Sequence, residues 1–336
     1  MPEELEPAGG GPGTATRAVS VTGGSMVAPL VGEITGDAGD TEGKAGPARR
    51  RRSHERTPRP SQSRFQGLGW GFWLAGAVVV FWVLVAVLAN VLPFQNPNSI
   101  HLNCLVTQLP SASHLLGCDT TGRDILARTA YGSRVSLIVG FASIAMGLVV
   151  GGTLGLVAGY FRGWLDELLT ILSNVFLSFP SLVLALVIVA YVGNSLFDIT
   201  LIIAIVAWPL LFRVVRASTI EYTQREYVLA ARALGSRPRR VLMTLLLPDV
   251  IPSAITYGLV GVAIAIVGEG ALSFLGQSVP APTATWGNMI AAGSVSMQTN
   301  LSLLLSPAIA MFSFILAINF MGDRLRGVLD VRQGVL

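Results

Sequence analysis

The residues whose types and spacing best suggest a contact surface lie between positions 225 and 235. Alanine, leucine, glutamate and arginine predominate there, which favours a helix, and Gly235 suits its C-terminal cap. A slim helix of this kind fits a groove on another protein, and its pattern fits a helix lying on the lipid surface equally well. A second helix is expected to start near Pro238. The candidate contact residues are Glu226, Tyr227, Ala230, Ala231, Arg232 and Gly235.

A second polar cluster lies between positions 114 and 124. Asp119 or Asp124 is expected to pair with Arg123 or to cap the following helix, within a tight turn. A metal site made of His114 and the two aspartates is the sharper alternative. A hydrogen-bonded turn explains the same residues equally well, so we predict no metal site. The loop residues singled out are Gly117, Asp119, Gly122, Arg123 and Asp124.

The chain has only two cysteines, Cys104 and Cys118, and both lie in this loop. In an oxidising compartment, a disulfide readily closes a ring of this length. We therefore predict a disulfide, with two unpaired thiols as the alternative.

Glu269 is the one carboxylate deep within an apolar run. Such groups are costly in a membrane and are often functional, so Glu269 is a candidate for a transport pathway. The favoured interpretation is structural, because Glu269 lies near the expected end of a span, where it can bond to polar groups of a neighbour.

Catalytic residues are not expected. The three histidines at positions 54, 101 and 114 lie outside the apolar runs. The pair Gly43-Lys44 is followed by Ala45 and lacks the preceding glycine-rich run that a phosphate-binding loop needs. We therefore expect no ATPase and no cofactor within this chain.

Composition indicates which elements must position these residues. The 336 residues are 52% hydrophobic and only 12% charged, about half the charge of a soluble domain. The class is therefore all-α, a polytopic membrane protein with six transmembrane helices. Pro180 and Pro209 are expected to interrupt helix hydrogen bonding, as hinges or as packing adaptations. The six spans are expected near residues 70–92, 136–159, 168–192, 196–212, 250–275 and 301–320.

Arginines indicate the orientation. They cluster in the segment before the first span, between the fourth and fifth spans, and after the sixth. By the positive-inside rule, both termini are cytoplasmic, and the net charge of +4 reflects topology and lipid rather than nucleic acid. Residues 1–64 have the composition of a disordered tail and no signal peptide.

Glycines recur every four residues in the second span, at positions 147, 151, 155 and 159. This spacing places them on one smooth helix face that permits close packing. The packing partner is either another span of this chain or another subunit.

Several motifs together carry a family resemblance. The segment with Glu226, Ala230, Ala231 and Gly235 resembles the EAA loop of permease subunits in bacterial ABC importers. The chain from about Phe65 onward is similar to the second permease of the dipeptide, oligopeptide and nickel importers. Two features depart from that family: Cys118 replaces a usual threonine, and the N-terminal tail is long. The further matching runs are Leu116–Asp124, Glu269–Gly276 and Pro282–Met289.

The resemblance implies a type I ABC importer permease fold over residues 65–336. It implies an extracytoplasmic loop at 94–132 and a cytoplasmic coupling loop at 217–248, in a plasma-membrane protein. Its implied partners are a homologous permease, two ATPase subunits that bind ATP and magnesium, and an extracytoplasmic substrate-binding protein. The implied cargo is peptide, with nickel or another small solute as the alternative. An ion-coupled transporter is less favoured, because midplane carboxylates and an internal repeat are not evident.

Overall fold

The computed structural model describes residues 69–333, and every named element in that range is a helix. The expected disordered tail at 1–64 lies outside the described residues. Two short π-helical stretches interrupt the longer helices. The elements are α1 (Gly69–Leu88), α2 (Leu102–Thr107), α3 (Ile125–Gly147), η1 (Leu148–Gly152), α4 (Thr153–Phe161), α5 (Trp164–Leu177), α6 (Ser181–Val192), α7 (Leu196–Tyr222), α8 (Glu226–Ala233), α9 (Pro238–Arg240), η2 (Val241–Leu246), α10 (Leu247–Phe274), α11 (Trp286–Val295) and α12 (Leu301–Gln333).

Five continuous helical stretches of the described chain are long and apolar enough to cross a membrane, and a sixth is counted if one bent pair forms a single span. Most of them extend beyond the predicted limits. The second span, for example, begins at Ile125 rather than near residue 136. The five are residues 69–88, 125–161, 196–222, 238–274 and 301–327.

The third predicted span is not one helix. Helices α5 and α6 replace it, and their axes are bent by 88°. The break falls at Ser178 and Phe179, directly before Pro180. Because a proline disfavours helical geometry in the residue before it and lacks an N–H, the helix ends there and restarts in a new direction. The interruption is therefore much larger than a kink.

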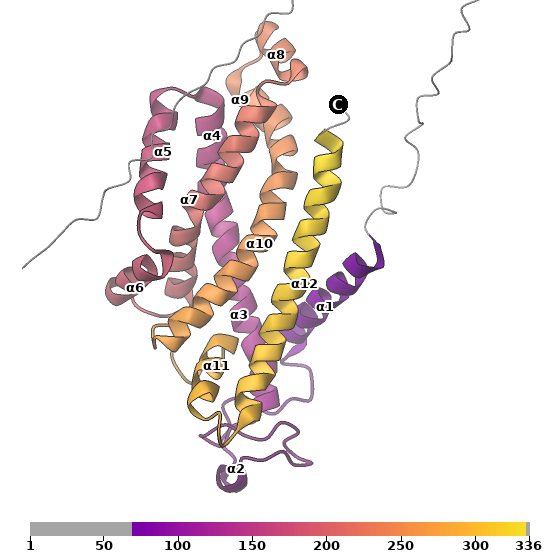
Figure 1. The fold of residues 1–336 in the computed structure, drawn as a ribbon, viewed down its shortest axis with the longest axis vertical. Coiled ribbons are helices and arrows are strands. Elements are labelled where there is room, and N and C mark those ends of the chain that lie inside the picture. Colours follow the sequence, from indigo (N-terminus) through magenta and orange to yellow (C-terminus); the bar gives the residue numbers. More distant parts are fainter. Residues whose placement is uncertain (1–68, 334–336) are drawn as a thin grey trace, which may run out of the picture. The chain divides into compact units, whose positions relative to one another are not determined.

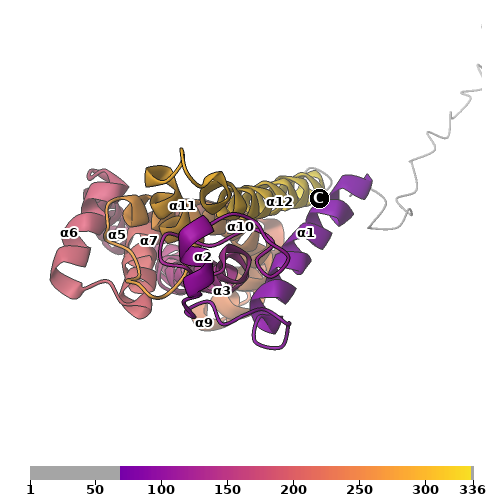
Figure 2. The same cartoon turned by 90° about the horizontal axis from the view of Figure 1, so that it is seen from below.

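The centre of the bundle is formed by α3, α7 and α10, with α12 alongside (Figure 1). Val139, Ile202 and Ile266 are fully buried between the central helices, and Phe314 of α12 packs against the same cluster. Helix α1 and the α5–α6 pair lie on opposite sides of this centre (Figure 2). Many of their apolar side chains are exposed, as expected for surfaces that face lipid or another membrane subunit.

The glycine stripe packs against α7 of the same chain. A Cβ atom added at Gly155 would lie 2.7 Å from the Phe212 carbonyl oxygen, and one at Gly159 would lie 2.8 Å from the Thr219 Cβ. The missing side chains therefore let two backbones approach closely. Of the two possible packing partners, the glycine stripe therefore contacts another span of this chain.

The short elements lie at the two ends of the bundle. Helix α8 projects at the end that α12 reaches with its C-terminal turns (Figure 1). Helices α2 and α11 lie at the opposite end, together with the loop that precedes α3. The two motif-rich regions of the sequence are therefore separated by the length of the spanning helices.

Candidate functional site

The first candidate site is α8 with the turn that follows it. The helix ends in a Schellman motif. The Ser236 N–H bonds to the Ala231 carbonyl oxygen and the Gly235 N–H to that of Arg232, each at 3.0 Å. Gly235 has a φ of +76°, which glycine adopts without strain. The predicted sequence of helix, sharp turn and second helix from Pro238 is present.

Most of α8 is exposed. Val228 is its one buried residue, and it packs against Leu242 and Leu246 of the following π-helical stretch. Leu234, just past the helix, is 87% exposed. The helix thus has one anchored face and presents its remaining surface outward. The predicted contact residues at the exposed surface are Glu226, Tyr227, Ala230, Arg232 and Gly235, and Ala231 is partly buried.

Two further contacts tie α8 to the spanning helices. The Tyr227 hydroxyl donates a 2.6 Å hydrogen bond to Asp249 Oδ2 in the first turn of α10. Partial burial, and then this hydrogen bond, raise the pKa of Tyr227, so the phenol remains a donor at physiological pH. The Arg232 guanidinium lies 5.7 Å from the ring centre of Tyr160 in α4. These two contacts connect α8 to α10 and α4.

The second candidate site is the loop before α3. Asp124 caps that helix by accepting a 2.7 Å hydrogen bond from the Ala127 N–H, and its other oxygen pairs with His114 Nδ1 at 2.8 Å. Asp119 Oδ1 accepts the N–H of Thr121 at 2.8 Å and that of Arg123 at 2.9 Å. Asp124 therefore has the predicted capping role.

Of the two expected roles, capping is the one present, and neither aspartate pairs with the Arg123 side chain. Asp119 instead pairs with Arg128, whose Nε lies 3.4 Å from Asp119 Oδ2. The turn directs only the backbone N–H of Arg123 toward Asp119, and the first turn of α3 brings Arg128 to the second oxygen. Nothing in the sequence distinguishes Arg128 from other arginines near a span.

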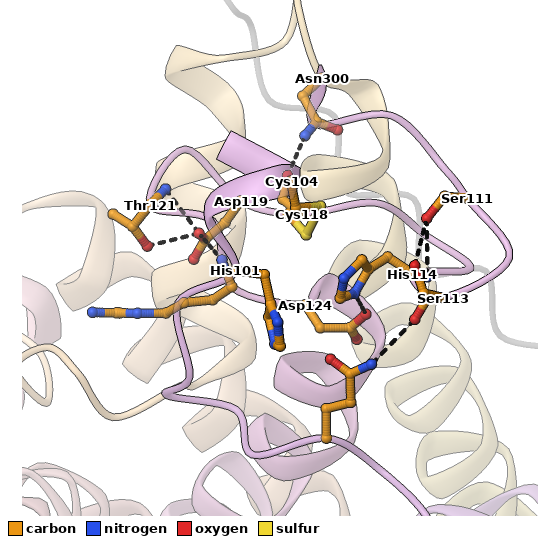
Figure 3. Close-up of a disulfide and its surroundings, with 12 residues drawn as sticks. His101, Cys104, Ser111, Ser113, His114, Cys118, Asp119, Thr121, Asp124 and Asn300 are labelled. Atoms are coloured by element: carbon orange, nitrogen blue, oxygen red, sulfur yellow. Dashed lines mark hydrogen bonds and ion pairs between the residues drawn. A yellow bond between two sulfur atoms is a disulfide. The ribbon is translucent and has the colours of Figure 1, made fainter. Parts of the chain in front are cut away.

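A disulfide joins Cys104 in α2 to Cys118 in this loop (Figure 3). The Asn300 side chain donates a 2.7 Å hydrogen bond to the Cys118 carbonyl oxygen and so ties the loop to the start of α12. Gly117 and Gly122 have φ values of +78° and +80°, which explains glycine at both turns.

The close-up also bears on the metal alternative. His114 and Asp124 bond to each other, while Asp119 is turned toward Thr121 (Figure 3). Among the described residues, one set of His, Cys and acidic side chains is close enough to share an ion: Cys104, His114 and Cys118. Because its two sulfur atoms are bonded to each other, this set is not a ready thiolate site.

Glu269 is buried, with 1% of its surface exposed. Its Oε1 accepts hydrogen bonds from Ser273 at 3.0 Å, Ser278 at 2.7 Å and Thr285 at 2.9 Å. The Thr285 hydroxyl also caps α11 by accepting the Asn288 N–H at 3.0 Å. This geometry favours the structural interpretation, since the carboxyl group joins α10 to the loop and helix that follow it.

Trp286, which the sequence shows only as part of the Pro282–Met289 run, has a structural role. Its indole Nε1 donates to the Thr129 carbonyl oxygen and its backbone N–H to Ser136 Oγ, both at 3.1 Å. Its ring packs edge-on against Trp82 at 5.2 Å. Trp286 thus fixes α11 against α3 and α1.

Comparison with known proteins identifies the class to which these features belong. Residues 151–335 match the family described as "Binding-protein-dependent transport system inner membrane component". The dipeptide transport system permease protein DppC of Alkalihalophilus pseudofirmus is 36% identical over 256 residues, which cover 76% of this chain and 84% of the relative. The glutathione transport system permease protein GsiD of Pectobacterium atrosepticum is 33% identical over 257 residues, which cover 76% and 85%.

A solved structure has a similar fold. A chain of the MetNI methionine ABC transporter, in an inward-facing conformation, aligns with a TM-score of 0.51 and 19% identity. The alignment covers 61% of this chain and 96% of that one. At this identity the likeness shows the fold alone. Together with the sequence matches, it shows that the chain belongs to the family of inner-membrane components of binding-protein-dependent transport systems and is an ABC importer permease.

Proposed function

We propose that this permease carries short peptides across the plasma membrane as one half of a permease pair. The relatives that support this cargo are a dipeptide permease and a glutathione permease, each covered over more than four fifths of its length. A homologous permease would complete the pathway. The exposed apolar surfaces of the spanning helices offer room for such a subunit.

The observation that carries the mechanism is the geometry of α8. Its exposed surface suits a cleft on an ATPase subunit, while Val228 and the Tyr227–Asp249 hydrogen bond connect it to the spanning helices. Closure of two partner ATPase subunits around ATP and magnesium would move α8, and α10 and α4 would follow. The spanning helices would then alternate between inward-open and outward-open states.

This mechanism requires an orientation. Helix α8 and the end of α12 would face the cytoplasm, where ATP is available, and the disulfide-bonded loop would face outward. The arginine pattern supports the same orientation. The outer loops, including residues 276–300, would then meet the extracytoplasmic substrate-binding protein.

A charge reversal tests the coupling role of α8. Glu226 is exposed in the first turn of α8, so Glu226→Lys is expected to weaken ATPase attachment and abolish peptide uptake without unfolding the permease. Glu167→Lys is a matched control, because Glu167 is an exposed glutamate in the first turn of α5 at the same end of the bundle. Co-purification of the ATPase and uptake into proteoliposomes are the two readouts.

The outcomes separate the coupling role from the cargo. Uptake that persists after deletion of the ATPase subunit, or an intact ATPase complex with Glu226→Lys, overturns the coupling role. Proteoliposomes that import nickel but not labelled dipeptides or tripeptides overturn the peptide assignment and leave the coupling role in place.

A further inference from the structure

A cleft of about 360 Å³, lined by both polar and apolar groups, lies among the loops at the end of the bundle opposite α8. Its lining comes from the turn before α3, the start of α3, the loop before α7, the loop after α10, and the N-terminal parts of α11 and α12. Thr120, Thr121 and Pro280 are exposed at its rim. The charged residues that line it are Asp119, Arg123 and Arg128.

Arg123 has no carboxylate partner in the described part of the chain. Its side chain is partly buried, and its Nε is shielded from solvent without a hydrogen-bond partner. The nearby Asp119 oxygen accepts the backbone N–H of Arg123 rather than its guanidinium. Shielding a donor on a charged group without a partner is costly. The Arg123 guanidinium therefore favours an incoming anion.

The positive charge of the Arg128 guanidinium is only partly compensated. It is 7% exposed, and its Nη1 donates to the carbonyl oxygens of Pro97 at 3.2 Å and Pro282 at 3.3 Å. Its Nε lies 3.4 Å from Asp119 Oδ2 without forming a hydrogen bond. Asp119 is the one acidic residue that lines the cleft, against two arginines. The cleft thus has an excess positive charge in a partly desolvated setting.

We propose that this cleft binds a carboxylate, and that the carboxylate is an acidic side chain of the extracytoplasmic substrate-binding protein. This inference rests on the proposed function. A guanidinium binds a carboxylate through two parallel N–H donors, which supplies both affinity and orientation. The volume accommodates an aspartate or glutamate side chain, which can enter past the exposed rim.

The construction of the cleft favours docking over passage of the cargo. Its lining comes from loops and the ends of helices, and Val279 is the one lining residue that also belongs to the central cluster around α3, α7 and α10. The disulfide and the Asn300 hydrogen bond hold one wall, and Ser278, bonded to Glu269, holds the other. Walls held in this way are pre-organised for a protein partner, which lowers the entropic cost of binding.

The test measures binding between the intact importer in nanodiscs and the purified binding protein that supports its peptide import. Arg123→Gln is expected to weaken binding about tenfold and to reduce its dependence on salt, with Arg123→Lys intermediate. Arg134→Gln is the matched control, because Arg134 is exposed and lies outside the cleft. Basal ATPase activity without the binding protein should be unchanged in all variants.

A charge swap then identifies the source of the carboxylate. Arg123→Glu should weaken binding further, and replacing one acidic residue of the binding protein by arginine should restore it. Arg123→Gln that binds like the wild type overturns the inference. If that variant also loses import of free-acid peptides but keeps import of amidated ones, the cleft binds the cargo instead. A wild-type importer that neither binds this protein nor imports peptide overturns the proposed function itself.

Discussion

Glu269 shows how one side chain can organise an end of the bundle. Three hydroxyl groups converge on a single carboxyl oxygen, from one turn further along α10, from the following loop and from the cap of α11. An apolar replacement leaves the hydroxyls of Ser278 and Thr285 without this acceptor, whereas Ser273 Oγ also donates to the Glu269 carbonyl oxygen at 3.1 Å and keeps that bond. Each loss in a buried site costs about 1–3 kcal/mol before relaxation.

We therefore expect Glu269→Ala to lower the thermal midpoint of the purified permease clearly. Glu269→Gln should retain most of the stability, because its amide oxygen still accepts hydrogen bonds. Differential scanning fluorimetry in detergent measures both. An unchanged midpoint for the alanine variant would show that this network contributes nothing to stability.

At the scale of single residues, the sequence predicts types of interaction better than partners. Asp124 was expected to cap a helix, and it does so, because capping depends on residues within one turn. The partner of Asp119 depends on how the turn meets the helix, and Arg128 takes the place expected for Arg123. Similarly, nothing local to Tyr227 indicates that its hydroxyl reaches Asp249, 22 positions further along the chain.

At the scale of elements, the contact between α4 and α7 depends on missing side chains. A Cβ at Gly155 would meet two backbone atoms, the Phe212 carbonyl oxygen at 2.7 Å and the Arg216 nitrogen at 3.0 Å. Backbone atoms of a packed helix cannot move aside cheaply. At the neighbouring Gly152, the nearest atom is Val215 Cγ2 at an ordinary 3.9 Å.

Gly155→Ala is therefore expected to destabilise the permease by about 1–3 kcal/mol through overpacking. Gly152→Ala is the control and should leave stability near the wild-type value. Denaturation of the two purified variants in the same detergent compares them. Equal stability would mean that the two helices do not depend on close backbone approach at this point.

The two prolines in predicted spans have different effects on their helices, which the sequence does not predict. Pro209 lies inside the continuous helix α7, whereas α5 ends before Pro180 and α6 restarts at 88°. The residue type and the apolar context are similar, so both are consistent with the same sequence pattern. Packing against neighbouring helices determines whether the helix continues past the proline or breaks there. The number of apolar runs was predictable, but the direction of α6 was not.

At the scale of the whole molecule, the two motif-rich regions lie at opposite ends of the bundle. In the proposed orientation, a cysteine introduced at Ser236 should react with a membrane-impermeant maleimide only in inside-out vesicles. One introduced at Thr120 should react only in intact spheroplasts. Both positions are accessible, Thr120 being exposed and Ser236 partly so, and the native cysteines are bonded to each other. Labelling of both from the same side would contradict the topology.

The bond between Cys104 and Cys118 also imposes an order on maturation. Both thiols precede α3, so they leave the ribosome before most of the spanning helices. In the proposed orientation they meet an oxidant only after the first apolar helix has inserted and delivered them outside. A cell that lacks extracytoplasmic thiol oxidation would therefore accumulate a permease whose cytoplasmic elements are folded but whose outer loop still carries two free thiols.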